Sequence, residues 1–377
     1  MKKYELIATT TFGLEAVVKR EVLNLGLEVL STENGKVTFL GDEKDIVKAN
    51  LWLRCADRVL LKIGEFKAVT FDELFDQTKA INWGDLIPKD GKIPVDGQSV
   101  KSTLFSISDS QAIVKKAIIE SLKEKYKLEW FPENGPVFNV KVSILKDIAT
   151  LTIDTSGVAL HKRGYRKNAV AAPIKETLAA ALIYLSFWSK DRILVDPFTG
   201  SGTIPIEAAM IGRNIAPGLN RDFAFKKWPI ISEDIYREAT REAYSLIDQD
   251  TEIKIYAYDI SKEYISAATE NADDAGVLDC IQFEEKDFLD FEPEEDYSIL
   301  ITNPPYGERV SEKNQVLDLY KVMGKKLNKL KTWSMYFITS DDDFENVFGR
   351  VADRRRKLYN GKIKTTYYQY HGENPKK

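Results

Sequence analysis

The stretch that decides the fold of this 377-residue chain is I-L-V-D-P-F-T-G-S-G-T, at Ile193 to Thr203. A short apolar strand pattern enters a turn with two glycines, and an apolar helix pattern follows at once. Glycines at a strand-to-helix turn let a ligand approach the backbone, and the helix N-terminus offers free N–H groups. The spacing matches neither the dinucleotide-binding GxGxxG pattern nor the phosphate-binding loop, so a nucleotide phosphate is not the implied ligand. By themselves, these residues favour a purely structural turn.

Beyond Pro173 the order strand then helix repeats to the end of the chain. The expected strands cover residues 192–195, 253–258, 281–283, 297–301 and 333–338. The expected helices run through Met210 and over residues 262–275, 315–330 and 342–348. This alternation predicts an α/β domain with a doubly wound, mostly parallel, Rossmann-like sheet and helices on both faces. Residues 362–370 are expected to close the sheet as an antiparallel strand, and residues 213–252 are expected to be an insertion.

The first 155 residues show a different, α+β pattern. Strands over 4–8 and 37–39 and helices over 14–24 and 44–53 predict a ferredoxin-like module at 1–60. A second α+β module is expected at 61–155. Its predicted elements are helices over 71–78 and 111–126 and strands over 137–144 and 148–153, the strands being joined by a turn at Lys146-Asp147. The basic segment from Ser156 predicts a linker at 156–172, ahead of a last domain at 173–377.

The composition limits the kinds of structural and catalytic site that the chain can form. Hydrophobic residues make up 44% of the chain and charged residues 30%, as in ordinary globular proteins. Two distant cysteines, Cys55 and Cys280, exclude a disulfide framework and a zinc ribbon. Two histidines make histidine-based metal sites and a Ser-His-Asp triad improbable. The sequence therefore predicts chemistry without a metal.

Charge is distributed unevenly along the chain. Up to Val170 there are 26 Lys and Arg against 23 Asp and Glu, and beyond it 28 against 35. The net charges are thus +3 and −7, which permits nucleic-acid binding by the first half and equally fits ordinary solvated faces. The longest apolar stretch, Leu178 to Trp188, is too short to span a bilayer, and Glu5 interrupts any secretory signal. We therefore expect no membrane partner and a cytoplasmic location.

N-P-P-Y at Asn303 to Tyr306 is the sharpest chemical signal. Two prolines stiffen the backbone directly after Asn303 and fix its amide and the adjacent carbonyl of Pro304 in space. An exocyclic NH₂ on a nucleobase is a poor nucleophile, because its lone pair is delocalised into the ring. Two acceptors that bind its protons would aim that lone pair at an electrophile, and Tyr306 would stack on the base. Asn303, Pro304 and Tyr306 are therefore the predicted catalytic residues.

Asp259 ends the next apolar strand, I-K-I-Y-A-Y-D. In doubly wound sheets a carboxylate at this place typically accepts hydrogen bonds from ribose hydroxyls. An acidic N-cap for the helix that begins near Ser261 fits this residue equally well.

These motifs together resemble a known family. D-P-F-T-G-S-G-T, Asp259, Asp287-Phe288 and N-P-P-Y-G-E-R at Asn303 to Arg309 look like successive motifs of class I S-adenosylmethionine-dependent amino-methyltransferases. L-H-K-R-G-Y-R at Leu160 and A-P-I-K-E-T-L-A-A-A at Ala172 narrow the resemblance. The chain resembles THUMP-domain RNA methyltransferases, in particular the N-terminal half of the bifunctional large-subunit rRNA guanine-N2 methyltransferase and its single-headed relatives.

The resemblance implies a fold, a cofactor and a site. Residues 61–155 would be a THUMP RNA-binding domain, and 173–377 a class I methyltransferase domain. The partner would be large-subunit (23S) rRNA or its assembly intermediate, and the cofactor S-adenosyl-L-methionine. The cofactor-binding residues would be Thr177, Asp196, Phe198, Gly200, Gly202, Thr203, Asp259, Ile260, Asp287, Phe288 and Asn303.

Three other functions compete with rRNA guanine-N2 methylation. DNA adenine-N6 and protein glutamine-N5 methyltransferases also use N-P-P-Y, because both methylate planar amino or amide nitrogens. The N-terminal α+β half argues against both, since those enzymes carry other recognition modules. An RNA-binding or ribosome-assembly protein without activity is the alternative of a different class. The chemically suitable residues at every motif argue against it.

Overall fold

Two compact units make up the structure. The computed structural model describes residues 2–166, 173–293, 295–306 and 313–373. Unit 1 contains Met1–Thr10, Val18–Leu160 and Asp222–Glu242. Unit 2 contains Thr11–Val17, His161–Arg221 and Ala243–Lys377.

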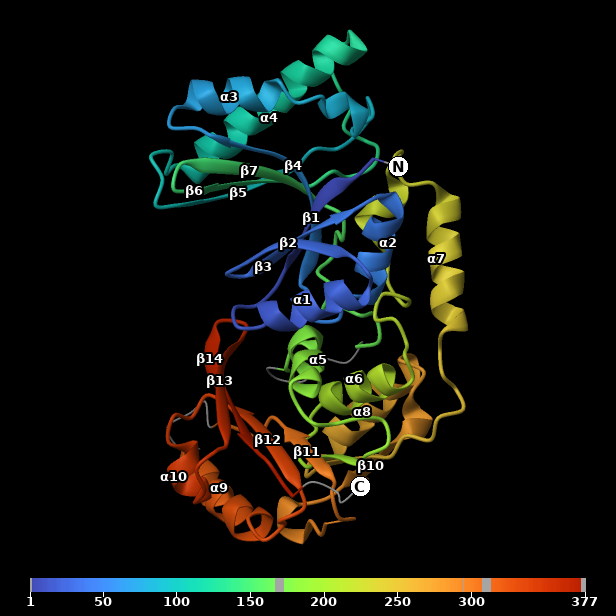
Figure 1. Ribbon diagram of the computed structural model, residues 1–377, viewed down its shortest axis with the longest axis vertical. Helices are drawn as coiled ribbons and strands as arrows, with labels where there is room; N and C mark the ends of the chain where they lie inside the picture. The colour runs from blue at the N-terminus through green and yellow to red at the C-terminus, as the bar shows by residue number, and fades with distance from the viewer. Residues whose placement is uncertain (1, 167–172, 294, 307–312, 374–377) are drawn as a thin grey trace. The chain divides into compact units, whose positions relative to one another are not determined.

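Unit 1 holds a mostly antiparallel sheet, in which the described strands follow the order β2-β3-β1-β4-β7-β6-β5 (Figure 1). Only β5 and β6 pair in parallel among these neighbours. The strands are β1 (Tyr4–Thr9), β2 (Glu28–Glu33), β3 (Lys36–Gly41), β4 (Arg58–Lys67), β5 (Val95–Val100), β6 (Val140–Leu145) and β7 (Ile148–Asp154). One sheet therefore runs through both predicted N-terminal modules.

Side-chain caps and left-handed turns set the ends of several unit 1 elements. Its helices are α1 (Glu15–Asn24), which spans both units, and α2 (Glu43–Trp52), α3 (Phe71–Lys79), η1 (Trp83–Asp85) and α4 (Ile107–Tyr126). Asp42 and Thr70 start α2 and α3 with capping boxes, in which each accepts a backbone N–H three residues on. Lys146 and Asp147 both have positive φ, 51° and 65°, as the tight turn between β6 and β7 requires.

Part of the insertion folds with unit 1. Residues Asp222–Glu242 carry η2 (Ala224–Lys227) and most of α7 (Glu233–Ser245). The buried Trp228 ring stacks on Phe138 with centroids 5.0 Å apart, and its Nε1 donates to the Val137 carbonyl at 3.0 Å. This aromatic pair is a long-range tie between the insertion and the N-terminal half of the chain.

Unit 2 holds the predicted doubly wound sheet, with described strands in the order β10-β9-β8-β11-β12-β14-β13. The first five pair in parallel, and β14 and β13 add to them antiparallel. The strands are β8 (Leu194–Asp196), β9 (Ile255–Asp259), β10 (Ile281–Glu285), β11 (Ile299–Thr302), β12 (Ser334–Thr339), β13 (Arg354–Asn360) and β14 (Ile363–Tyr370). The fold class predicted from the sequence is confirmed.

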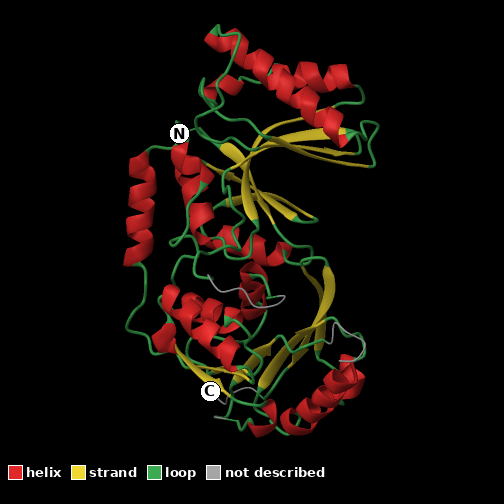
Figure 2. Ribbon diagram, turned by 180° about the vertical axis from the view of Figure 1, so that it is seen from behind, coloured by secondary structure: helices red, strands yellow, loops and turns green. Residues whose placement is uncertain are grey.

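Helices cover both faces of this sheet. Helices α5, α6 and α8 lie on one side, and α9 and α10 on the other (Figures 1 and 2). Their bounds are α5 (Glu176–Tyr184), α6 (Thr203–Gly212), α8 (Lys262–Asp274), η3 (Leu278–Cys280), η4 (Phe288–Asp290), α9 (Lys313–Leu327) and α10 (Phe344–Phe348). None of the helices described combines the length and apolar composition needed to cross a membrane.

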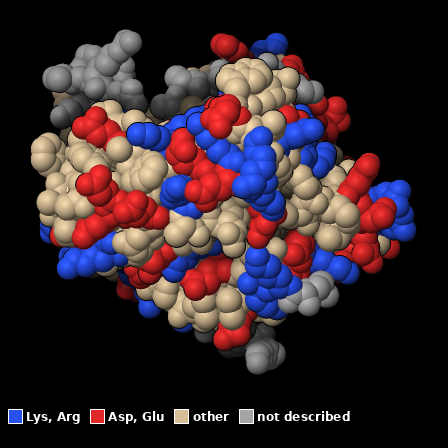
Figure 3. Space-filling model, turned by 90° about the horizontal axis from the view of Figure 1, so that it is seen from above, with Lys and Arg blue, Asp and Glu red and all other residues tan. Residues whose placement is uncertain are grey.

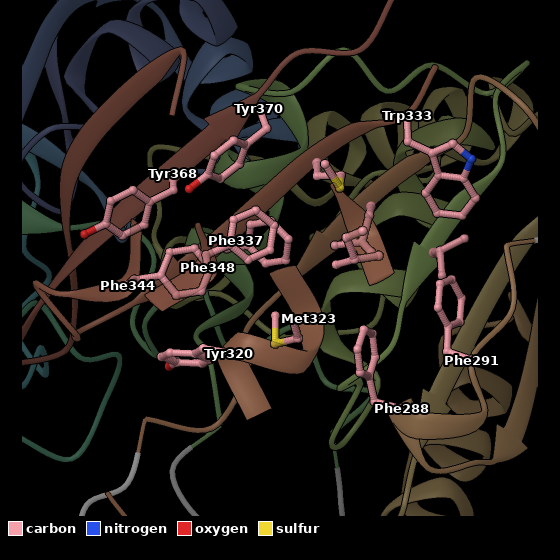
Figure 4. Close-up of a cluster of buried hydrophobic side chains, with 14 of the residues drawn as sticks. Phe288, Phe291, Tyr320, Met323, Trp333, Phe337, Phe344, Phe348, Tyr368 and Tyr370 are labelled. Carbon is pink, nitrogen blue, oxygen red and sulfur yellow. The ribbon is translucent and has the colours of Figure 1, made fainter. Parts of the chain in front are cut away.

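An aromatic core fills the space between the sheet and α9 and α10. Phe337 on β12 packs with Phe344, Phe348 and Tyr370, with ring centroids 5.1–5.9 Å apart (Figure 4). The same cluster continues through Phe291 and Phe288, which lies beside the glycine turn. Burial of these rings fixes the strand ends that carry the candidate site.

Candidate functional site

The glycine turn leaves the carboxyl end of β8 and enters α6. Gly200 and Gly202 have positive φ values of 53° and 79°, a backbone conformation that L side chains rarely adopt. A Cβ on Gly202 would lie 3.0 Å from the Ala268 Cβ, so the close approach of α8 also requires glycine there. A Cβ on Gly200 would meet no atom within 4 Å. The turn therefore presents bare backbone to open space beside Gly200.

Asp259 holds this turn from the neighbouring strand. Its Oδ2 accepts from the Gly200 backbone N–H at 2.9 Å, and its Oδ1 accepts from the Ser261 N–H at 3.0 Å. Ser261, not Asp259, is the N-cap of α8, because its hydroxyl accepts from the Tyr264 N–H at 3.3 Å. The alternative reading of Asp259 as the N-cap is thus wrong, and its carboxylate instead joins β9 to the glycine turn.

Asp196 joins the glycine turn to β11. The buried Asp196 carboxylate accepts from the Thr302 hydroxyl at 2.6 Å and from the Phe198 N–H at 3.3 Å. Burial raises the pKa of Asp196 to about 7, and the nearby charge of Asp259 adds to this, although the two hydrogen bonds act against it. The bond to Thr302 brings the end of β11, and so Asn303, next to the turn.

The N-P-P-Y segment follows β11 directly. The Tyr306 hydroxyl donates to Oδ1 of the half-buried Asn303. Tyr320 on α9 donates to the Pro305 carbonyl at 2.9 Å, which ties the segment to the aromatic core. Pro304 is buried. The remaining residues of the predicted motif, Gly307 to Arg309, lie outside the described residues.

The predicted site residues after β9 and β10 lie around the same turn, with one exception. The Phe288 and Phe198 rings stack with centroids 5.2 Å apart. The Asp287 side chain accepts from the Leu289 N–H at 2.9 Å and so starts η4. Ile260 is 68% exposed, and no contact of its side chain with the other predicted residues is found in the described structure. The structure thus brings together most of the predicted cofactor residues at one edge of the sheet.

Thr177 reaches the site through its neighbours. It is buried in the first turn of α5, directly after Glu176. Arg166 donates to the hydroxyl of Thr203, the first residue of α6, and its Nη1 lies 3.3 Å from Oε1 of Glu176. Burial raises the pKa of Glu176 despite this ion pair. Arg166 therefore holds the starts of α5 and α6 together.

A second buried ion pair fixes the same segment. Arg163, within the predicted linker, lies 3.2 Å from Oε1 of Glu207 on α6, and both side chains are almost wholly buried. The Tyr165 hydroxyl donates to the same Glu207 oxygen at 3.2 Å. Breaking such a pair from one side leaves a buried charge without its partner. Residues 163–166 are consequently part of unit 2, while residues 167–172 lie outside the described residues.

Sequence reasoning missed Thr302 and Arg166 as site residues. Thr302 gives no local signal, since a threonine at a strand end is ordinary until the register puts it opposite Asp196. Arg166 sits in the L-H-K-R-G-Y-R motif, so the resemblance marked its segment but not its role. In the part of the chain that the structure describes, no group of three or more His, Cys, Asp or Glu side chains has the arrangement of a metal site.

Family comparisons match all three parts of the chain. Residues 163–369 match the family described as RMKL-like, methyltransferase domain. Residues 5–60 match the RlmL ferredoxin-like domain, and residues 68–154 match the THUMP domain. These matches confirm the resemblance inferred from the motifs.

Individual relatives are similar over nearly the full length. "Putative RNA methyltransferase YpsC" from Bacillus subtilis is 52% identical over 372 residues, 98% of this chain and 96% of that protein. A crystal structure titled "a predicted N6-adenine-specific DNA methylase" from Listeria monocytogenes is 50% identical with a TM-score of 0.95, covering 99% of this chain and 97% of that one. SMU.472, 45% identical with a TM-score of 0.95 and full coverage of both chains, was crystallised in complex with SAH.

SAH is what remains of S-adenosylmethionine after methyl transfer, so the SMU.472 complex confirms the cofactor prediction for the family. The sheet order, the glycine turn and the three domain matches agree with one another. The chain therefore belongs to the RMKL-like methyltransferases in which a ferredoxin-like domain and a THUMP domain precede the methyltransferase domain.

Proposed function

We propose that this protein transfers a methyl group from S-adenosylmethionine to the exocyclic N2 of a guanine in large-subunit rRNA, in the cytoplasm. The observation that carries the proposal is the 2.6 Å hydrogen bond from Thr302 to Asp196. It joins the strand end that leads to Asn303 to the strand end that leads to the glycine turn. Asn303, which would hold the amino nitrogen, and the glycine turn, which would hold the cofactor, therefore follow strand ends at one edge of the sheet.

The residues at the glycine turn fit the cofactor. Bound S-adenosylmethionine supplies an electrophilic methyl group. The open backbone at Gly200 and Gly202 would lie against its methionine part, while Asp259 would accept from the ribose hydroxyls. Phe288 and Asp287 would flank the adenine. Thr177, at the start of α5, would border the methionine end of the pocket, where Arg166 fixes the helix.

The catalytic contribution of the chain is the alignment of a weak nucleophile. The Asn303 amide oxygen and the Pro304 carbonyl would accept the two protons of the guanine N2 amino group and direct its lone pair at the methyl group. In the structure the Asn303 oxygen accepts from the Tyr306 hydroxyl. An amide oxygen has two lone pairs, so it can keep this bond and accept from the base, with the Tyr306 ring beside it for stacking.

Unit 1 would supply RNA recognition. It contains most of the residues that match the ferredoxin-like and THUMP domains, and these lie in the part of the chain with a net charge of +3. On the face seen in Figure 3, Lys and Arg side chains are interspersed with Asp and Glu side chains. Recognition that combines shape and scattered phosphate contacts suits such a surface better than one continuous basic patch.

A second candidate is N6-methylation of adenine in DNA. The Listeria monocytogenes relative carries this activity in its title, and the N-P-P-Y segment suits either amino group. The match of residues 68–154 to the THUMP domain favours RNA.

Methyl transfer to defined acceptors tests both candidates. The protein would be incubated with tritiated S-adenosylmethionine and, separately, with large-subunit rRNA, tRNA, DNA and bulk protein. Labelled products would then be digested and separated. We expect N2-methylguanosine from large-subunit rRNA. N6-methyladenine from DNA, or label in protein alone, would refute the proposal.

A further inference from the structure

The carboxyl-terminal hairpin of unit 2 carries an unusual concentration of positive charge. Residues Arg354 to Lys364 read R-R-R-K-L-Y-N-G-K-I-K, with six basic and no acidic residues in eleven. They form β13, the turn at Gly361 and the start of β14. This segment lies in the half of the chain whose net charge is −7. Its charge is therefore a local feature and does not reflect the composition around it.

The hairpin extends beyond the edge of the sheet that holds the candidate site. The last residue of β12, Thr339, pairs with Thr366, whereas β14 begins at Ile363. Because β14 runs antiparallel to β12, the three residues before Thr366 continue past the carboxyl ends of the parallel strands. At about 3.3 Å per residue, the hairpin projects roughly 10 Å beyond that edge. Asn303 follows β11 at the same edge.

Four of these six cations have no carboxylate partner within the described residues. Arg355 pairs with Glu345 at 2.6 Å, and Lys364 lies 3.6 Å from Asp342. Arg354, Lys357 and Lys362 are exposed, and none of the described ion pairs involves them.

Crowding like charges on one strand is unfavourable to the fold. Burial and the neighbouring charge of Arg354 lower the pKa of Arg356. The Nε of Arg356 is a buried donor without an acceptor in the described structure. A bound anion would relieve this repulsion and supply acceptors.

Aromatic rings lie beside the cations. Phe12, from the segment Thr11–Val17 of the same unit, is 49% exposed. Its ring contacts the Tyr359 ring edge-on, with centroids 6.2 Å apart, and the Lys357 Nζ lies 5.5 Å from the centre of the Tyr359 ring. A Cβ on Gly13 would lie 2.9 Å from the Lys357 carbonyl, so only glycine lets the segment lie this close to β13. Exposed aromatic rings among cations are typical of surfaces that bind unpaired nucleotides.

We propose that the β13–β14 hairpin, with Phe12 beside it, is a second RNA-binding surface, and that it holds the phosphates flanking the nucleotide presented to Asn303. This inference rests on the proposed RNA methylation. It places RNA contacts in the methyltransferase unit itself, next to the reacting base and separate from the THUMP domain. Single-stranded RNA is the occupant that the pairing of phosphate-binding cations with stacking rings favours.

The test compares two triple variants with the same loss of charge. The hairpin variant is Arg354→Gln, Lys357→Gln and Lys362→Gln. The control is Lys325→Gln, Lys329→Gln and Lys331→Gln, three exposed lysines in α9 and the loop before β12, at the opposite edge of the sheet. Binding of in vitro transcribed large-subunit rRNA is measured at several potassium chloride concentrations. The RNA KM and kcat are measured alongside.

We expect the hairpin variant alone to lose about two units of slope in log affinity against log salt, since each lost phosphate contact removes roughly 0.7–0.9. Its RNA KM should rise about tenfold or more at 0.1 M salt, with kcat at saturating RNA and the cofactor Kd unchanged. The charge-preserving variant Arg354→Lys, Lys357→Arg and Lys362→Arg should keep the wild-type slope. Equal slopes in the hairpin variant and the control would overturn the inference.

Phe12→Ala isolates the stacking contribution. We expect RNA affinity to fall about tenfold without a change in the salt slope, because stacking on a ring releases no counterions. Wild-type RNA affinity in this variant would show that Phe12 is not part of the RNA-binding surface. A wild-type protein that methylates no RNA would instead refute the proposed function itself, so the two failures are distinguishable.

Discussion

The two sheets differ in how their strand ends are arranged. Within the described residues each unit holds a seven-stranded sheet. In unit 1 nearly all neighbours are antiparallel, so successive strands end at opposite edges. In unit 2 five parallel strands end at one edge. Each of the five ends on a polar residue: Asp196, Asp259, Glu285, Thr302 and Thr339.

This difference explains why the candidate site lies in unit 2. Polar side chains at strand ends are also present in unit 1, where Asp154 ends β7 and accepts from Ser156 and Gly157. There the Asp154 carboxylate binds its own turn and Arg58 at the start of antiparallel β4, because no other strand end of the same direction lies beside it. The parallel direction of the strands, rather than the kind of residue at their ends, therefore brings these polar side chains together at one edge of the sheet. The following predictions test that comparison.

The largest effect on activity is expected at the edge where the five parallel strands of unit 2 end. Asn303→Ala should lower kcat about a hundred- to a thousandfold, because it removes an acceptor that strengthens its bond in the transition state. Cofactor affinity should remain nearly intact. Asn303→Asp should be less damaging, since a carboxylate still accepts. Single-turnover methylation of rRNA measures both, with the exposed Asn346→Ala on α10 as control. Near-normal rates in Asn303→Ala would remove Asn303 from catalysis.

Asp196 should make unit 2 sensitive to pH. Its pKa is about 7 in the folded protein against an ordinary value of 3.8, so the folded state binds more protons between these values. Stability should therefore fall as pH rises from about 4 through about 7. Asp196→Asn should remove the free-energy cost of burying a charged carboxylate. Its free energy of unfolding should exceed that of wild type by roughly 2–4 kcal/mol at pH 8, and the difference should shrink toward pH 4. Denaturant unfolding across this range measures it, and a pH-independent difference would contradict the assignment.

Asp259 joins two parallel strand ends, and its removal should weaken cofactor binding. Asp259→Ala should lower S-adenosylmethionine affinity about ten- to a hundredfold, the worth of a charge-assisted contact of about 1.5–3 kcal/mol. It also frees the Gly200 and Ser261 N–H groups, so we expect a stability loss of about 1 kcal/mol. Calorimetric titration measures the affinity. Unchanged affinity would limit Asp259 to holding the turn.

The smallest effect is expected in unit 1. Trp228→Phe keeps a ring on Phe138 but removes the hydrogen bond to the Val137 carbonyl, which should cost about 1 kcal/mol of stability. Cofactor affinity should not change, because the candidate cofactor residues all lie in unit 2. Trp130→Phe is the matched control, since Trp130 is 74% exposed. A change in cofactor affinity equal to that of Asp259→Ala would contradict the separation of roles between the units.

Prediction from the sequence succeeded where the signal is local. The glycine turn, the strand-end aspartates and the regular alternation after Pro173 gave the sheet of unit 2, because apolar strands and helices of that regularity have few other arrangements. Four strands were missed: β2, β4, β5 and β13. In β5 Gly97 interrupts the pattern, and β13 starts with four basic residues. Both are the outermost strands of their sheets, and their exposure permits residues that are rare in central strands.

The domain boundaries at 60, 155 and 172 remain predictions. In the structure, two segments belong to a different unit from the residues next to them in sequence, and no local pattern indicates this. Residues Asp222–Glu242 fold with unit 1, and Thr11–Val17 fold with unit 2. Their anchors, Trp228 on Phe138 and Phe12 on Tyr359, join residues far apart in sequence. A fragment cut near residue 156 would therefore lose Phe12 and expose Trp228.

The sequence by itself determined which chemical groups this protein has and in what order: a bare glycine turn, two strand-end aspartates and a rigid Asn-Pro-Pro-Tyr segment. It did so because backbone freedom at glycine, rigidity at proline and the hydrophobic period act over a few residues. Only the tertiary structure decided that Thr302 binds Asp196, that Arg166 joins two helix starts, and that the six cations lie on a hairpin that extends past the strand ends of the same sheet. These contacts depend on strand register and on packing between distant segments, which a one-residue shift in pairing would abolish.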